Sequence, residues 1–212
     1  MRPLDERRAR LQDARLYLVT GPVSEELLAE ALTGGVDMLQ LRDKQASDEE
    51  LLAVAPLFRS VCDRFGALFL VNDRPDLARA AGADGVHVGQ DDTPPEEVGG
   101  DLLVGLSTHT PEQFDGGLRS PADYLCAGPV HETPTKQGRP ATGLGLIGHA
   151  AARSPERPWF AIGGIDPTNI GEVAAAGAER VVVVRAIRDA DDPRAAAAAL
   201  RAALTGEARV GA

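Results

Sequence analysis

Short apolar runs rich in valine, leucine and isoleucine alternate along the chain with longer amphipathic stretches. This alternation is typical of repeated βα units whose strands form a parallel sheet. The expected strands lie at residues 15–20, 38–43, 68–73, 85–89, 102–107, 123–128, 159–164 and 180–187. Eight parallel strands with intervening helices in 212 residues predict the α/β class and a single-domain (β/α)8 TIM barrel.

Local signals for the ends of helices support this count of units. Ser47 and Glu50 have the spacing of a capping box. Three pairs predict an N-cap followed by proline in the first helical turn: Thr110-Pro111, Asp166-Pro167 and Asp192-Pro193. The segments TGGVDMLQL, AGADGVHV and AGAERVVVV repeat one unit, in which glycine ends a helix and an acidic residue precedes a buried strand.

The main alternative to a barrel is an open, doubly wound sheet, which uses the same βα units. No long interruption marks a point where the strand order could reverse, so a closed barrel is favoured. We expect an N-terminal extension at residues 1–14, the barrel domain at 15–205 and a C-terminal tail at 206–212. The alanine-rich stretch after Pro193 predicts a helix that packs on the barrel.

Composition and charge limit the partners of the chain. A net charge of −10 and a pI near 4.9 argue against binding to nucleic acid or to an anionic membrane surface. No apolar run is long enough to span a bilayer. Cys62 and Cys126 have no disulfide or metal-site spacing, so we expect a cytoplasmic protein. Whether it forms a homo-oligomer is left open.

In a βα barrel, reactive groups belong at the C-terminal ends of the strands and in the loops that follow. Polar residues or glycine mark six of these ends. They are Gln40, Arg42, Asp43 and Lys44; Asn72 and Asp73; Gly89, Gln90, Asp91 and Asp92; Ser107; the loop at residues 128–139; and Gly163 with Gly164.

The second strand end offers groups for an anion. Gln40, Arg42 and Lys44 alternate, so an amide, a guanidinium and an ammonium share one side. Arginine can hold two phosphate oxygens in a fork and lysine adds a compact charge, so the set matches a diphosphate. The alternative is a salt bridge at the rim with Asp43 or a neighbouring acid. Lys44 and Lys136 are the only two lysines in the chain, and we expect both to serve one anionic ligand.

The third and fourth strand ends offer carboxylates for a cation. Asp73 and Asp92 follow adjacent strands, so both can reach one Mg²⁺, which prefers oxygen ligands. Asp91 competes with Asp92 for this role, and spacing does not choose between them. A helix-capping aspartate is the structural alternative. Asn72 should face the other side of its strand end and address a ring nitrogen or an amino group.

The seventh strand ends in Gly163-Gly164, ahead of an expected helix N-terminus. Backbone N–H groups there form a natural phosphate site, with a tight turn as the structural alternative. Among the histidines, His87 should pack inside the barrel, and His109 receives no role.

Seven segments, in this order, resemble the thiamine phosphate synthase (thiamine-phosphate pyrophosphorylase) family. They are QLRDK, VNDRPDLA, GADGVHVGQDD, GLSTHT, GPVHETPTKQG, AIGGI and AGAERVVVV. The resemblance implies a barrel transferase that joins 4-amino-2-methyl-5-(diphosphooxymethyl)pyrimidine to 4-methyl-5-(2-phosphooxyethyl)thiazole. The implied products are thiamine phosphate and diphosphate, the implied cofactor is Mg²⁺, and the implied route is dissociative.

The resemblance also implies roles for individual residues. Contacts to the pyrimidine diphosphate fall on Gln40, Leu41, Arg42, Asp43, Lys44, Asn72, Ser107 and Lys136, of which Arg42, Lys44, Ser107 and Lys136 would be catalytic. Asp73 and Asp92 would hold Mg²⁺. The thiazole phosphate site falls on Thr133, Pro134, Thr135, Gly164, Val184 and Arg185. At Arg185 the chain departs from the serine of many relatives, which leaves its role open.

Three other functions compete with the synthase. A thiazole tautomerase-like protein of the same fold would bind thiazole phosphate or the product without synthase activity, yet it has no use for the diphosphate and metal residues. A non-catalytic thiamine phosphate binding protein would bind product without turnover. A phosphosugar isomerase or aldolase fits the barrel, but no lysine lies inside a strand and no acid/base pair stands out.

Overall fold

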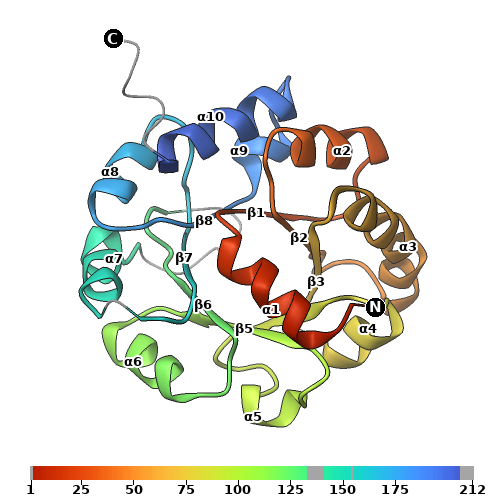
Figure 1. Cartoon of the computed structure of the whole chain (residues 1–212), viewed down its shortest axis with the longest axis horizontal. Helices are drawn as coiled ribbons and strands as arrows, with labels where there is room; N and C mark the ends of the chain where they lie inside the picture. The colour runs from red at the N-terminus through yellow and green to blue at the C-terminus, as the bar shows by residue number, and fades with distance from the viewer. Residues whose placement is uncertain (1, 133–140, 154, 206–212) are drawn as a thin grey trace.

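Eight parallel strands form a closed barrel in the order β1 to β8 (Figure 1). The computed structural model describes residues 2–132, 141–153 and 155–205. The strands are β1 (Leu16–Thr20), β2 (Met38–Leu41), β3 (Leu68–Asn72), β4 (Gly85–Val88), β5 (Leu103–Thr108), β6 (Tyr124–Ala127), β7 (Trp159–Ile162) and β8 (Val181–Val183). Tyr17 of β1 pairs with Val182 of β8 and closes the barrel. The predicted TIM barrel is confirmed and the open sheet is wrong.

Helices surround the strands on the outside of the barrel. They are α2 (Glu25–Thr33), α3 (Asp48–Phe65), α4 (Pro75–Ala80), α5 (Pro95–Val98), α6 (Pro111–Arg119), α7 (Gly143–Ala152), α8 (Ile170–Ala175), α9 (Arg185–Arg188) and α10 (Pro193–Thr205). The alanine-rich α10 packs against α2, α8 and α9, and its Ala197 and Leu200 are buried, as expected. Within the described residues, no helix has the length and apolarity needed to cross a membrane.

Most of the predicted helix starts are confirmed. Ser47 and Glu50 form the capping box of α3, and the Thr110 side chain caps α6. Asp192 precedes α10 and accepts a hydrogen bond from the backbone N–H of Ala195 at 2.9 Å. These local contacts satisfy N–H groups that a helix leaves unpaired at its start.

Two predicted boundaries are wrong. The eighth strand ends at Val183 rather than at residue 187, because the chain turns into the short helix α9 at Arg185. Helix α8 begins at Ile170, not directly after Asp166-Pro167. The Asp166 carboxylate instead accepts hydrogen bonds from the backbone and the hydroxyl of Thr168, at 2.7 and 2.6 Å, and so stabilises a turn.

Side chains of the strands alternate between two apolar cores, as the two-residue period of a strand requires. Outward residues such as Leu39 and Phe69 pack under the surrounding helices. Inward residues such as Met38, Leu70 and Phe160 fill the barrel. The same alternation, continued to the C-terminal ends of the strands, decides which polar side chains reach the interior.

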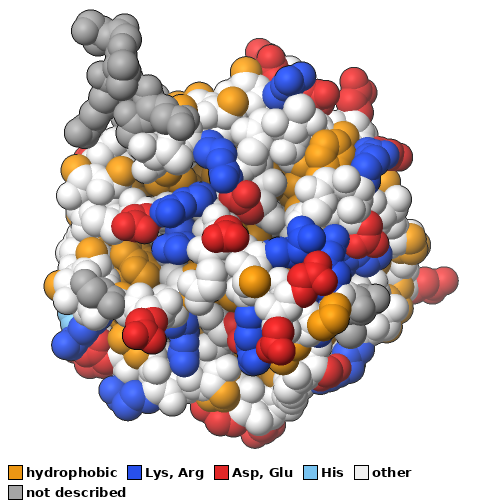
Figure 2. Space-filling model, viewed as in Figure 1, with side chains coloured by type: hydrophobic (Ala, Val, Ile, Leu, Met, Phe, Trp, Pro, Cys, Tyr) orange, Lys and Arg blue, Asp and Glu red, His pale blue; other side chains and the backbone are white. Residues whose placement is uncertain are grey.

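Helix α1 (Leu4–Asp13) closes the N-terminal end of the barrel and is the element formed by the expected extension. Figure 1 shows it crossing the centre of the barrel, and its Leu11 is buried among the inward-facing residues. Arg7 is buried and donates to the carbonyl oxygen of Asp84 at 2.6 Å, and Arg8 pairs with Asp123 at 2.8 Å. Figure 2 shows acidic and basic side chains interspersed over this face. Access to the interior is therefore from the C-terminal end.

Replacing Leu11 with alanine should lower the free energy of unfolding by about 2–4 kcal/mol, because the lost side chain leaves a cavity at the barrel floor. Urea denaturation followed by circular dichroism measures the change. Gln12→Ala is the matched control, since Gln12 is exposed on the same helix, and it should change this free energy by less than about 0.5 kcal/mol. Equal effects of the two substitutions would contradict the conclusion that α1 closes the N-terminal end of the barrel.

Candidate active site

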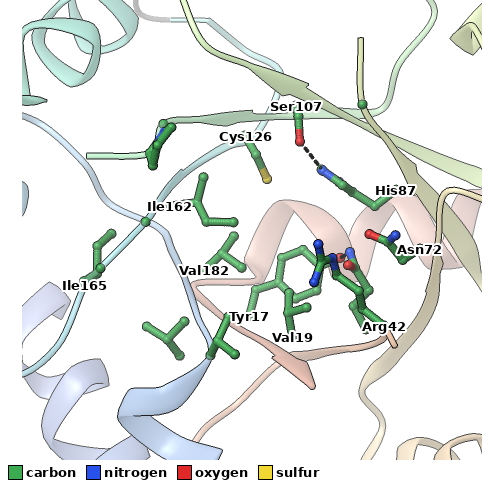
Figure 3. Close-up of a pocket in the computed structure, with 18 of the residues that line it drawn as sticks. Tyr17, Val19, Arg42, Asn72, His87, Ser107, Cys126, Ile162, Ile165 and Val182 are labelled. Carbon is green, nitrogen blue, oxygen red and sulfur yellow. Dashed lines mark hydrogen bonds between the residues drawn. The ribbon is translucent and has the colours of Figure 1, made fainter. Parts of the chain in front are cut away.

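A cavity of about 670 Å³ opens at the C-terminal end of the barrel and receives side chains from all eight strands. This volume is typical of pockets for small ligands. Figure 3 shows a polar side with Arg42, Asn72 and Ser107 facing an apolar side with Ile162 and Val182. The pocket can therefore hold charged and ring-shaped parts of ligands next to each other.

Most of the residues predicted for the site come together in this cavity. Those that line it are Gln40, Arg42, Lys44, Asn72, Asp73, Asp92, Ser107, Gly164, Val184 and Arg185. The side chains of Leu41 and Asp43 do not: Leu41 points outward into the core under the helices, and Asp43 accepts a hydrogen bond from the backbone N–H of Gln45 at 2.9 Å. Thr133, Pro134, Thr135 and Lys136 lie outside the described residues.

Several lining residues were not predicted for the site. Tyr17, His87, Gln90 and Cys126 also face the cavity. Only His87 was expected inside the barrel. Strand alternation could have placed Tyr17 and Cys126 in the cavity, because both occupy inward-facing positions of their strands. Their apolar sequence neighbours, however, make them resemble ordinary core residues.

The two basic side chains that follow β2 differ in their partners. Lys44 Nζ lies 3.4 Å from Asp73 Oδ2, so the alternative of a rim salt bridge holds for this lysine, with Asp73 rather than Asp43. Across the described parts of the chain, the Arg42 guanidinium has no ion-pair partner, while its backbone N–H donates to the Thr20 carbonyl oxygen at 2.8 Å. Arg42 is anchored through its backbone and keeps its charged group for a ligand.

Asp73 has an unusual backbone conformation that brings it into the site. Its φ is 61°, and it is the one described non-glycine residue in the left-handed region. Its N–H donates to the His87 carbonyl oxygen at 2.8 Å, which fixes the turn. Adjacent residues of a strand point in opposite directions, but this turn breaks the alternation, so Asn72 and Asp73 both line the pocket. Such strain is found most often at functional sites.

The carboxylates of Asp73 and Asp92 lie close together. Burial, and then the Asp92 carboxylate, raise the pKa of Asp73, whereas Lys44 opposes the rise. Asp92 is held by the backbone N–H of Gly89, which donates to its Oδ2 at 2.7 Å, while Asp91 is exposed. Asp92 is therefore the carboxylate that acts on Asp73.

A divalent cation fits this pair of hard oxygen donors, since it would relieve the repulsion between two partly buried carboxylates. The described residues contain no group of three or more His, Cys, Asp or Glu side chains suited to a metal. Mg²⁺ held by Asp73 and Asp92 would therefore complete its shell with water and with oxygens of the substrate.

The glycines after β7 provide close access to the backbone. Gly163 and Gly164 have φ values of 110° and 63°, and both line the cavity. The Gly164 carbonyl oxygen accepts a hydrogen bond from the Asn169 side chain at 2.8 Å. The expected helix start directly after this pair is wrong, because α8 begins at Ile170. Within the described chain, the N–H groups of Gly164 and Ile165 have no hydrogen-bond partner, which leaves them suited to an anion.

A chain of hydrogen bonds runs beneath the polar side of the pocket. Gln40 Nε2 donates to the Tyr17 hydroxyl. The Tyr17 and Tyr124 hydroxyls are 3.1 Å apart, and Tyr124 lies 3.0 Å from His87 Nδ1. His87 Nε2 lies 2.9 Å from Ser107 Oγ (Figure 3). Two of the predicted site residues, Gln40 and Ser107, therefore form the ends of one buried network.

The fold and the cavity define a barrel enzyme whose site suits small anionic substrates. Comparison with known sequences identifies the family to which this barrel enzyme belongs. A family model described as thiamine monophosphate synthase matches residues 16–187. The chain belongs to this family, and it is a transferase of thiamine biosynthesis.

Known proteins support this membership over nearly the whole chain. The thiamine-phosphate synthase of Saccharopolyspora erythraea is 53% identical over 213 residues, which cover 93% of this chain and 96% of that protein. The thiamine-phosphate synthase of Thermobifida fusca is 49% identical, with 95% and 97% covered. The solved thiamine phosphate pyrophosphorylase from Pyrococcus furiosus matches with a TM-score of 0.83 at 33% identity, covering 93% and 98%.

Substituting alanine at Gly164 should lower the free energy of unfolding more than the same change at Gly82. Both glycines have nearly the same left-handed φ, 63° and 62°, which costs alanine about 1–2 kcal/mol at either position. A Cβ at Gly82 meets nothing within 4 Å, but one at Gly164 comes within 2.8 Å of His131 Cβ. Overpacking should add about 1–3 kcal/mol at Gly164 alone.

Thermal and urea denaturation of the two variants measure the difference. Gly82→Ala is the matched control for the backbone conformation. Equal losses of stability would show that the contact with His131 does not constrain the turn after β7.

Proposed function

We propose that this enzyme joins 4-amino-2-methyl-5-(diphosphooxymethyl)pyrimidine to 4-methyl-5-(2-phosphooxyethyl)thiazole, giving thiamine phosphate and diphosphate in a Mg²⁺-dependent reaction. The observation that carries the proposal is the convergence of Arg42, Lys44, Asp73 and Asp92 at one rim of the cavity, in a member of this family. Two cations and a metal-binding carboxylate pair suit a diphosphate leaving group.

The polar side of the pocket would bind the pyrimidine diphosphate. Arg42 would hold diphosphate oxygens, because its guanidinium has no ion-pair partner among the described residues. Lys44 would turn from Asp73 toward the diphosphate as the carboxylate takes up a metal ligand role. Lys136 would add a second ammonium from the loop after β6. Asn72 lies on the same side and would address the pyrimidine ring (Figure 3).

Asp73 and Asp92 would hold the Mg²⁺ ion. When bound, the ion supplies positive charge at the diphosphate oxygens and so stabilises the departing group. The close pairing of the two carboxylates supports this role, since burial and the charge of Asp92 raise the pKa of Asp73. Lys44 would then be free of its 3.4 Å salt bridge to Asp73.

The reaction would follow a dissociative route. The bond between the pyrimidine methylene carbon and the diphosphate oxygen breaks first, and the electron pair leaves with diphosphate. The resulting cation is stabilised by the pyrimidine amino group, and the thiazole nitrogen then attacks it. Such a step needs charge at the leaving group and a dry cavity more than a general base. Arg42 and Lys44 supply charge, and Ile162 and Val182 keep the other side apolar.

The thiazole phosphate would bind at the apolar end of the cavity. Backbone N–H groups of Gly164 and Ile165 would receive the phosphate, and Val184 would pack near the ring. Arg185 is exposed at the start of α9 and faces the same cavity, so it can add a second phosphate contact. The segment Thr133 to Thr135 would complete the site. We place the enzyme in the cytoplasm, because the buried thiols of Cys62 and Cys126 suit a reducing medium.

Diphosphate release from purified protein with both substrates and Mg²⁺ tests the proposal. Release should equal thiamine phosphate formation and should stop in EDTA. A folded protein that binds thiamine phosphate without turnover would contradict the synthase and favour the tautomerase-like or non-catalytic alternative.

Asp92→Asn should reduce turnover by on the order of 100-fold or more, because it removes one charged ligand of the metal. Asp91→Asn is the matched control, since the neighbouring Asp91 carries the same charge and is exposed, and it should retain activity. Steady-state kinetics over a range of Mg²⁺ concentrations measures both. The opposite result would assign the metal to Asp91.

Lys136→Ala should reduce kcat by about 100-fold, because it removes one positive charge that stabilises the departing diphosphate. The control is Arg119→Ala, which removes an exposed charge at the end of α6. Turnover that is unchanged in Lys136→Ala would show that the two lysines do not serve the same ligand.

A further inference from the structure

Five buried polar side chains form one continuous chain of hydrogen bonds inside the barrel. Gln40, Tyr17, Tyr124, His87 and Ser107 follow each other in this chain, and none is more than 7% exposed. They come from five different strands. Gln40 and Ser107 line the cavity at the two ends, whereas Tyr124, in the middle, does not line it.

The surrounding residues are shaped to hold this chain in place. Gly105 of β5 faces Tyr124 and His87, and a Cβ there would lie 2.5 Å from His87 Nδ1 and would overlap the Tyr124 ring. Phe160 contacts both phenol rings edge to face, with ring centroids 5.8 Å from Tyr17 and 5.6 Å from Tyr124. Packing therefore fixes the positions of the hydroxyl groups, and any side chain at Gly105 would displace them.

The direction of each hydrogen bond in the chain follows from the number of hydrogens that each side chain carries. Burial raises the pKa of both phenols, so each keeps a single hydrogen. The Tyr17 oxygen already accepts from Gln40 Nε2, so its own hydrogen must go to Tyr124. Were Tyr124 to donate to Tyr17 instead, the Tyr17 hydrogen would be buried without an acceptor among the hydrogen bonds of the described residues, which is costly.

The same accounting continues from Tyr124 to the other end. Tyr124 accepts from Tyr17, so its hydrogen goes to His87 Nδ1. A neutral imidazole then carries its hydrogen on Nε2 and donates it to Ser107 Oγ. Ser107 is left with its own hydroxyl hydrogen. At the other end, the Gln40 carbonyl oxygen has no partner within the described residues.

We propose that Tyr17, Tyr124 and His87 are positioning residues that form a one-way relay, which makes Gln40 an acceptor and Ser107 a donor toward the same ligand. This inference rests on the proposed function, in which both ends contact the aminopyrimidine diphosphate. The Gln40 oxygen then receives a hydrogen from the amino group, and Ser107 donates to an acceptor atom of the ring or of the diphosphate. If the direction of one hydrogen bond in the relay is reversed, the direction of every other hydrogen bond in it must reverse as well.

The variant Tyr124→Phe tests the relay, because it removes only the hydroxyl in the middle and changes no group that lines the cavity. KM for the pyrimidine diphosphate should rise by about 5- to 10-fold. Without the Tyr124 hydroxyl, neither Gln40 nor Ser107 is held in the orientation that binds the ligand, and each orientation is worth about one neutral hydrogen bond. KM for the thiazole phosphate should stay within about twofold of its original value. A rise in both KM values alike would overturn the relay in favour of general misfolding of the site.

Thr108→Val is the matched control for loss of a buried hydroxyl. Thr108 is fully buried on β5, donates to the Cys126 carbonyl oxygen at 3.0 Å, and does not line the cavity. This variant should lose stability and keep both KM values within about twofold. If it raised KM for the pyrimidine diphosphate as much as Tyr124→Phe does, the relay would be overturned.

Nitrogen-15 NMR of the histidine rings measures the direction of the relay without substrate. In the unsubstituted protein, His87 should carry its hydrogen on Nε2, with Nδ1 unprotonated; a His87→Gln variant assigns the signal. Tyr124→Phe should give a mixture of tautomers. Hydrogen on Nδ1, or on both nitrogens, in the unsubstituted protein would overturn the proposal even if Tyr124→Phe does not fold. The two proposals can fail separately. If the protein shows no synthase activity but His87 carries its hydrogen on Nε2, the proposed function is contradicted and the relay is supported.

Discussion

The two-residue period of strand side chains, imposed on a closed parallel barrel, is the constraint on which this structure depends. It separates the apolar residues into a core under the helices and a core inside the barrel. At the C-terminal ends the same period decides which groups reach the pocket. Gln40 and Ser107 have the inward phase and line the cavity, whereas Leu41, next to Gln40, lies in the outer core.

Features that repeat along the chain could be predicted from the sequence. The eight apolar runs, the glycines before strands and the polar strand ends together identify the barrel and place Arg42, Asn72 and Asp92 at one rim. Single backbone conformations could not be predicted. The left-handed φ of Asp73 and the turn into α9 after Val183 depend on contacts between strands, and the run VVVVRAI carries the same apolar pattern in strand and helix.

The chain is acidic overall and yet belongs to a family that handles phosphorylated substrates, so its charges must be arranged locally. At the rim of the pocket, positively and negatively charged side chains lie next to each other. Lys44 pairs with Asp73, and under the proposed function the Asp73–Asp92 pair would hold a cation that also attracts phosphate oxygens. Two acidic residues would thus contribute to anion binding, which net charge alone does not indicate.

Polar groups inside the barrel make ligand recognition strict, because a buried hydrogen-bonding group without a partner is costly. The two tyrosines in apolar strands resemble core residues in the sequence. In the barrel, Gly105 pairs with both His87 and Tyr124, and this register brings the Tyr124 hydroxyl to His87 and to the Tyr17 hydroxyl. In the relay, every interior hydrogen has an acceptor, and only the two ends remain to be satisfied. A ligand that lacks an amino hydrogen for Gln40 or an acceptor for Ser107 would leave one end unpaired, and this would select against analogues more strongly than apolar contact does.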